Sequence, residues 1–308
     1  MKKQFLLPGM LVLFVALIFT NCKKEASPTD PQTEVSAHSD DQSNFDNQID
    51  DIANDADIAV ESSSSFTGRT DQTQSIICNA TVVVDTLSNP RTITITYNGN
   101  NCFGTVSRTG IVVISMAAGV HWKDAGAALT ITCNNLHITR LSDNKSVTIN
   151  GAKTITNVSG GLLVNLATLG TITHAITSSG ITVTFDNGSQ RSWHIAKQRE
   201  FTYNNGVVVT TTGTHTEGTT SGIAEWGVNR FGHTFATAIT TPMVIRQDCN
   251  FRLVSGQVIH VLPNVTATGT FGLNANGDPT TCPGTGHYYM KIVFVGQNGA
   301  TIIAILPY

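Results

Sequence analysis

After Thr70, apolar and polar positions alternate along most of the chain with a period of two, which is the spacing of a β-strand. The clearest segments are Thr92–Tyr97 and Ile181–Phe185, where large apolar residues fall on one face and threonines on the other. One apolar face and one threonine-rich face are typical of an antiparallel sheet that packs on one side and meets water on the other.

The alternating segments are separated by turn residues, and no long helical crossover lies between them. Asn-Gly pairs favour tight hairpins, so we expect one around Asn150-Gly151 and another around Asn187-Gly188. Leu162–Ile176 is interpreted as a single strand. The pattern predicts an all-β protein, a large antiparallel meander of about fifteen strands over residues 70–308 that is curled or folded into two layers.

Residues 44–62 depart from this pattern and predict one N-terminal helix. Apolar residues recur there at helical spacing, namely Phe45, Ile49, Ile52, Ala53, Ala56 and Val60. The aspartates lie mostly off that stripe, so we expect them on a solvated face. They suggest calcium binding as the alternative, but no frame supplies both the Gly and the Glu of an EF-hand loop.

The N-terminus has the pattern of an export signal. Lys2 and Lys3 precede an apolar segment from Phe5 to Thr20, and Cys22 follows directly. This arrangement resembles the lipobox of bacterial lipoproteins, which predicts a signal peptide over residues 1–21 and lipidation of Cys22. Residues 22–43 are rich in Pro, Ser, Thr and Asp, and they predict a flexible, lipid-anchored tether. Lys23-Lys24-Glu25 resembles the signal that sends Bacteroidota lipoproteins across the outer membrane to the cell surface.

Charge is distributed unevenly. Residues 23–69 contain 11 acidic and 3 basic residues, a net charge of −8, whereas residues 70–308 contain 10 acidic and 13 basic residues, a net charge of +3. The scattered basic residues argue against nucleic-acid binding. The acidic segment is either a solvated tether or a segment that docks on the body, and we favour the solvated tether because screened surface charges contribute little.

Five cysteines remain besides Cys22, which in an exported protein indicates two disulfides and one thiol. If residues 87–90 turn the first hairpin, Cys78 faces Gly99, and Cys102 lies three residues further on. We therefore predict a Cys78–Cys102 disulfide and, by elimination, a Cys249–Cys282 disulfide. Cys133 is expected to be a buried free thiol, and no Cys-x-x-Cys pair indicates a metal site.

Catalytic motifs are absent from the sequence, which has no Gly-x-Ser-x-Gly elbow and no His-x-x-x-His zinc frame. Glu200, Glu217 and Glu225 are the candidates for a paired-carboxylate glycosidase site, since such a pair needs only closeness in space. Six aromatic residues are either a sugar-binding platform or, the interpretation we favour, packing residues: Trp122, Trp193, Trp226, Tyr203, Tyr288 and Tyr289. We expect no metal and no cofactor.

Several longer motifs resemble uncharacterised lipoproteins of the Bacteroidota. They run through Cys78–Asp85, Asn89–Tyr97, Arg108–Ile114, Thr240–Cys249 and the terminal Ala304–Tyr308. The resemblance spans the β-rich body and implies one exported β-domain with a lipid anchor. It carries no catalytic residues over to this chain.

These observations predict a lipid-anchored protein of the cell envelope with a non-enzymatic binding or structural role. Its partners would be the outer membrane and a glycan or protein ligand. One alternative is a carrier or chaperone that holds an apolar ligand in the concavity of a curled sheet. The other is a carbohydrate-active enzyme.

Overall fold

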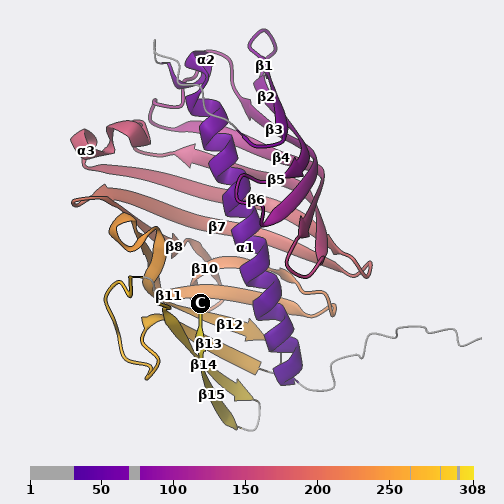
Figure 1. The fold of residues 1–308 in the computed structure, drawn as a ribbon, viewed down its shortest axis with the longest axis vertical. Coiled ribbons are helices and arrows are strands. Elements are labelled where there is room, and N and C mark those ends of the chain that lie inside the picture. Colours follow the sequence, from indigo (N-terminus) through magenta and orange to yellow (C-terminus); the bar gives the residue numbers. More distant parts are fainter. Residues whose placement is uncertain (1–30, 69–76, 264, 285, 297–298) are drawn as a thin grey trace, which may run out of the picture.

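The computed structural model describes residues 31–68, 77–263, 265–284, 286–296 and 299–308. The predicted all-β class is confirmed, because fifteen antiparallel strands form a single sheet (Figure 1). The strands are β1 Ala80–Asp85, β2 Arg91–Asn100, β3 Val106–Met116, β4 Ala127–Arg140, β5 Ser146–Asn157, β6 Thr171–Phe185, β7 Gln190–Tyr203, β8 Val207–Gly213, β9 His215–Glu217, β10 Thr220–Val228, β11 Thr234–Arg246, β12 Arg252–Leu262, β13 Val265–Leu273, β14 Tyr289–Gly296 and β15 Thr301–Pro307.

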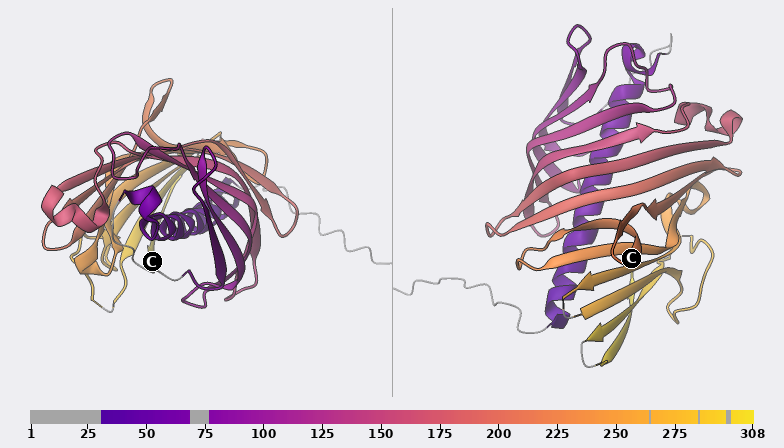
Figure 2. Two further views of the ribbon diagram at one scale, coloured as in Figure 1. Left: turned by 90° about the horizontal axis from the view of Figure 1, so that it is seen from above. Right: turned by 180° about the vertical axis from the view of Figure 1, so that it is seen from behind.

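Most strands pair with their neighbours in sequence, as a meander requires. The order is continuous from β1 to β7 and from β10 to β15, and β7 pairs with β10. Strands β8 and β9 form side pairings, β8 with β7 and β11, and β9 with β10. Seen from above, the sheet curls around a long helix instead of folding into two sheet layers (Figure 2).

The helix in the concavity, α1, spans Pro31–Glu61. It begins thirteen residues before the predicted start at residue 44, so residues 31–43 are helical and the predicted flexible tether is wrong there. The proposed signal peptide, Cys22 and the rest of the tether lie outside the described residues. A short helix, α2 (Ser64–Thr67), follows α1 and places Phe66 fully in the core.

The sequence explains why the predicted start of α1 was too late in the chain. The helical stripe that begins with Phe45 continues toward the N-terminus at the same spacing as Gln42, Asp41, His38 and Glu34, all of which are buried. These side chains are polar, so a search for apolar periodicity ends at Phe45. Polar partners on the sheet, described below, make their burial favourable.

The core lies between α1 and the concave face of the sheet. The apolar positions of the alternating strands point inward, including Ile93 and Ile95 of β2 and Ile181 and Val183 of β6. Ile52 and Ala56 of α1 pack against this face and are fully buried. The alternation predicted from the sequence is therefore confirmed.

The first hairpin has the predicted register. Ala80 pairs with Tyr97 and Asp85 pairs with Thr92, which continues to Cys78 opposite Gly99. Cys78 and Cys102 form a disulfide with a Cα–Cα distance of 5.1 Å, as predicted. Cys249 and Cys282 form the second disulfide, and Cys133 is a buried free cysteine in β4.

We predict that the Cys78→Ser/Cys102→Ser double variant loses about 3 kcal/mol of unfolding free energy, since the disulfide closes a loop with a sequence separation of 24. Chemical denaturation of the oxidised proteins measures this loss. The Cys133→Ser variant is the control for removing a sulfur atom that closes no loop. Equal stability of the double variant and the wild type would contradict the prediction.

Two turn predictions have different outcomes. Asn187-Gly188 turns the β6–β7 hairpin, as predicted. Asn150-Gly151 does not turn, because β5 runs straight through it. Gly151 has a φ of 127°, and a Cβ atom there would lie 2.8 Å from the carbonyl oxygen of Gly180 in the adjacent strand β6. The glycine therefore allows a bulge and a close backbone approach within the sheet.

The assignments of two strands, β6 and β10, also differ from the sequence prediction. Leu163–Asn165 forms a 3₁₀ turn (η1) and Leu166–Leu169 a short helix (α3), so β6 begins only at Thr171. Gly170, with a φ of 80°, ends α3 and separates it from the strand. A second 3₁₀ turn, η2, spans Gln247–Cys249. Strand β10 was not predicted, because Ser-Gly-Ile-Ala-Glu-Trp-Gly has few β-branched residues.

Candidate functional site

The concave face beneath α1 is the candidate functional site, because charged and aromatic side chains gather there from strands far apart in sequence. Helix α1 holds seven Asp and two Glu but no Lys or Arg. Six basic residues of the sheet and its loops face it: Arg108, Lys153, Arg191, Lys197, Arg199 and Arg230. The interface is therefore complementary in charge as well as in shape.

Among the described residues, three Arg–Asp ion pairs connect α1 to the sheet along its length. Arg230, in the loop after β10, pairs with Asp41, and its Nε lies 2.8 Å from Oδ2. Arg199 of β7 donates to Asp50 at 2.7 Å. Arg108 of β3 lies 2.8 Å from Asp55.

These pairs correct two expectations from the sequence. The aspartates of residues 44–62 were expected on a solvated face, which holds for Asp50 and Asp51, whereas the Asp55 side chain is only 12% exposed. Asp41, which was expected in the solvated tether, has a side chain that is only 4% exposed. Tyr97 of β2 also donates its hydroxyl to Asp55 at 2.9 Å. The acidic segment thus docks on the body from residue 31 onward, and the solvated tether is wrong for this part. The Asp41 and Asp55 carboxylates are largely buried, so solvent and salt screen their ion pairs less than they screen surface pairs.

A polar and aromatic cluster forms the centre of the interface. Glu225 of β10, 1% exposed, accepts a hydrogen bond from Trp193 Nε1 at 2.7 Å. Gln42 of α1 and Lys197 of β7 also contact this carboxylate. The Phe45 ring stacks on the Trp193 ring with a centroid distance of 3.8 Å. The cluster therefore joins helix α1 to two strands that follow it by about 150 to 180 residues in the chain.

Arg191 completes this cluster. Its guanidinium lies 3.4 Å from the centroid of the Trp193 ring and donates to the side-chain Oε1 of Gln42 at 2.9 Å. A guanidinium over an aromatic face gains electrostatic stabilisation that increases when water is excluded. Sequence reasoning named Trp193 and Glu225 separately. It did not find their contact, because Glu225 lies on the unpredicted strand β10, and it did not find Arg191, because Gln42 lies in the part of α1 that was taken as tether.

Lys153 of β5 shows the cost of burying charge beneath α1. Its Nζ donates to the Ile49 carbonyl at 2.9 Å. Burial lowers the pKa of Lys153 to about 8, although the nearby Asp50 carboxylate acts in the opposite direction. Burial likewise raises the pKa of Cys133 to about 11, so this thiol stays protonated and unreactive at neutral pH.

His38 is a buried imidazole on α1. Its ring lies 4.6 Å from the Phe235 ring and 5.5 Å from the His260 ring. Among the described residues, neither of its ring nitrogens has a hydrogen-bond partner. Burial, with the positive charge of Arg191 and the adjacent His260, holds the pKa of His38 far below its ordinary value of 6.5.

We predict that acidification below about pH 6.5 destabilises the protein partly through His38. The unfolded chain binds a proton there that the folded chain excludes, so the unfolding free energy falls with a slope of up to about 1.4 kcal/mol per pH unit from this residue. Urea unfolding of the wild type and the His38→Leu variant over this range measures the difference, and the variant has the flatter profile.

The matched control is His137→Leu, which removes a histidine that is exposed on the sheet. His174 stays in all three proteins and contributes to the common slope, since burial lowers its pKa to about 4. The same slope in His38→Leu as in the wild type would contradict the assignment.

The three candidate glutamates do not converge. Glu225 pairs across the sheet with Ile195 and points to the concave side. Glu200 alternates with the inward-facing Arg199 and Phe201 and points to the convex side. Glu217 is exposed in the short strand β9. The structure therefore does not bring any two of these three candidate carboxylates together as a pair.

The six aromatic residues also do not form one platform. Trp122, Trp193 and Tyr288 are buried, which supports the packing interpretation for these three. Trp226 lies on the convex face, where it stacks with His215 at 4.0 Å and His194 at 5.3 Å. Tyr203 and Tyr289 lie at separate positions, at the end of β7 and the start of β14.

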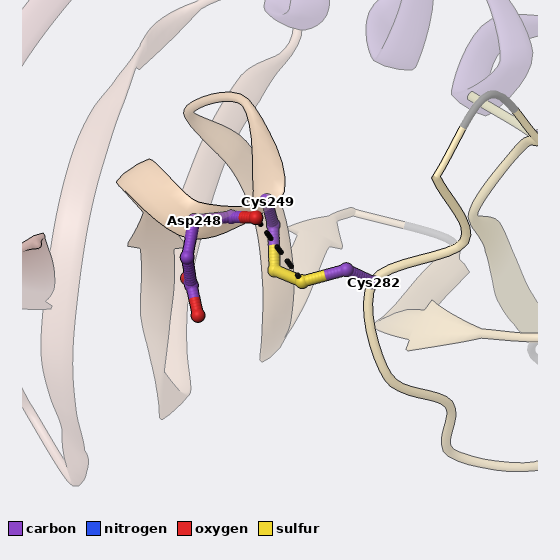
Figure 3. Close-up of side chains that lie close together, drawn as sticks. All are labelled: Asp248, Cys249 and Cys282. Atoms are coloured by element: carbon purple, nitrogen blue, oxygen red, sulfur yellow. Dashed lines mark hydrogen bonds between the residues drawn. A yellow bond between two sulfur atoms is a disulfide. The ribbon is translucent and has the colours of Figure 1, made fainter. Parts of the chain in front are cut away.

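Asp248, Cys249 and Cys282 lie close together at the end of β11 (Figure 3). The two sulfur atoms form the second disulfide, so neither is available as a thiolate ligand. Cys282 Sγ lies 3.8 Å from the Asp248 carbonyl oxygen, and the Asp248 carboxylate binds Arg246 instead. This group is therefore a turn closed by a disulfide, and its sulfur atoms offer no thiolate ligand to a metal.

No family model, curated protein or solved structure matches this chain. Among the described residues, no helix is both long enough and apolar enough to cross a lipid bilayer.

Proposed function

We propose that this chain is a lipid-anchored protein of the cell envelope, exposed at the outer membrane surface, with a non-enzymatic binding or structural role. The observation that supports it best is the docking of α1. Eight residues separate the proposed lipidation site, Cys22, from Pro31, and α1 is then held in the sheet by ion pairs and the Phe45–Trp193 stack. A lipid anchor on Cys22 would thus be joined to the β-sheet through helix α1, which packs against the sheet.

The convex face of the sheet is suited to binding a ligand from solution. Its convex face carries threonines and the Trp226 stack, and it is free of α1. A glycan or a protein is the proposed ligand of this face, because aromatic side chains with polar neighbours suit both.

Incorporation of a labelled fatty acid tests the anchor. The wild type is expected to carry the label and to sediment with membranes, and the Cys22→Ala variant is expected to lose both properties. Cys133→Ala is the matched control, because this buried cysteine lies in β4 and its loss leaves the label in place. A labelled Cys22→Ala variant would reject lipidation at Cys22.

Protease treatment of intact cells tests the location. Degradation of the anchored body from outside supports the surface, whereas protection until the outer membrane is permeabilised contradicts it and favours the periplasmic side. The ligand class is then tested with glycan arrays and protein ligands against the Trp226→Ala variant.

The carrier alternative requires α1 to leave the concavity, since its side chains occupy the inward face of the sheet. An environment-sensitive apolar dye distinguishes the two roles. We expect Phe45→Ala, which loosens α1, to bind dye at the concave face, and the wild type to bind dye only at its exposed apolar residues on β15, where Ile303→Asp reduces the signal. Saturable binding by the wild type that Ile303→Asp leaves unchanged would favour the carrier.

A further inference from the structure

The last strand of the sheet is unusually exposed for an apolar segment. Among the described residues, β15 pairs only with β14, so its other edge is open. Ile302, Ile303, Ile305 and Leu306 are 45%, 58%, 36% and 42% exposed. An open apolar edge is normally protected by charge, proline or a bulge, because it invites association.

The exposed side chains lie on both faces of β15. Ile302 pairs with Phe294 and Leu306 with Met290, and both partners pack toward the core, which places this pair on the concave side. Ile303 and Ile305 alternate with them and lie on the convex side. The strand therefore forms an apolar rim around the edge of the sheet.

The charge of this region is equally unusual. Residues 279–308 contain no Asp or Glu and a single basic residue, Lys291, which pairs across from Ile305. A segment with one lysine and no carboxylate of its own suits an anionic lipid interface. An exposed carboxylate beside it belongs to Asp278, which follows Gly277 at the Ile305 side chain. The segment does not suit a charged protein partner.

The position of the rim relates it to the N-terminus. Helix α1 begins beside the end of the sheet formed by β13–β15, as both views show (Figures 1 and 2). Glu34, in its first turn, is bound by Asn229 at 2.6 Å and His233 at 2.7 Å, both in the connection between β10 and β11. The nine links from Cys22 to Pro31 reach roughly 30 Å when fully extended. An acyl group on Cys22 would thus hold this end of the sheet close to the lipid.

We infer that the β15 rim, defined as Ile302, Ile303, Ile305 and Leu306, is a membrane-contacting surface that lies in the lipid interface beside the anchor. The inference rests on the proposed lipidation of Cys22. The open backbone edge of β15 cannot enter the hydrocarbon unpaired, and seven residues are too few to span it. The rim therefore inserts its side chains at the boundary between headgroups and acyl chains, where water still reaches the backbone.

Depth-dependent fluorescence quenching tests this contact in the acylated full chain, reconstituted in vesicles that contain anionic lipid and a spin-labelled lipid. A fluorophore is attached to Ile303→Cys or, as the matched control, to Val83→Cys. Val83 is 59% exposed, lies on the convex face and belongs to the opposite edge strand, β1. Wild-type protein measures background labelling of the buried Cys133.

We expect several-fold stronger quenching at position 303 than at position 83. Equal quenching at both positions, in a chain that carries the fatty acid, would overturn membrane contact by the β15 rim. The proposed lipidation of Cys22 would be unaffected by that result. Protection of position 303 by concentration-dependent self-association, without lipid quenching, also overturns it and assigns the rim to a second copy of the chain.

A chain that carries no fatty acid rejects the proposed anchor and is tested separately. A chain that begins at Lys23 retains every described residue, and its flotation with the same vesicles reports on the rim alone. We expect flotation that Ile303→Asp reduces at least about tenfold and Val83→Asp leaves unchanged. Absence of flotation, or an equal loss in both variants, contradicts the rim.

Discussion

Replacing Trp193 with alanine is expected to lower the unfolding free energy by about 3–5 kcal/mol, the range for a large aromatic removed from a packed core. Trp193 is fully buried, and it contacts the Phe45 ring of α1, the Phe235 ring at 5.5 Å and the Arg191 guanidinium. Its loss opens a cavity between α1 and the sheet and deprives Glu225 of a donor. Chemical denaturation measures the loss.

Trp226→Ala is the matched control, because Trp226 lies next to β7 on the convex face and is partly exposed. We expect a smaller loss there. A double-mutant cycle with Phe45→Ala isolates the stacking of the two rings, which we expect to contribute about 0.5–1.5 kcal/mol. Zero coupling would mean that α1 does not pack on Trp193.

Replacing Glu225 with alanine is expected to cost about 3–5 kcal/mol for a different reason, the loss of a buried charge from its partners. The carboxylate accepts from Trp193 and contacts Gln42 and Lys197, so the variant leaves buried donors and a lysine charge uncompensated. Thermal and chemical unfolding both report this loss.

Glu225→Gln separates charge from shape. The amide fills the same space and still accepts from Trp193, so we expect it to recover part of the loss while Lys197 remains without its counter-charge. Glu217→Ala is the control on exposed β9, with an expected change within about 0.5 kcal/mol. A Glu225→Ala variant as stable as this control would rule out a structural role for the buried cluster.

Sequence patterns predicted the features that depend on neighbouring strands. The period of two fixed which side chains of β2 and β6 face inward, and the turn at residues 87–90 fixed the register that brings Cys78 to Cys102. Both are local, because each strand pairs with the next one along the chain.

The candidate site was less predictable because it depends on polar burial. Asp41 and His38 look like tether residues until Arg230 and Phe235 are brought against them. Glu225 was named for its carboxylate, but its partners on α1 and β7 follow from the β7–β10 pairing, which skips two strands. Asn150-Gly151 has the residues of a turn, and only the approach of Gly180 shows why the chain needs them within a strand.

The docking of α1 has a consequence for the order of folding. The meander is built mostly from contacts between neighbouring segments, which form quickly. Helix α1 is synthesised first, yet Glu34 meets His233 only after 199 further residues have followed. The helix can therefore dock only after most of the sheet has been synthesised. Until then, its acidic side chains and the basic residues of the concave face are both exposed to solvent. Closure of α1 onto the sheet is the late, long-range step that completes this fold.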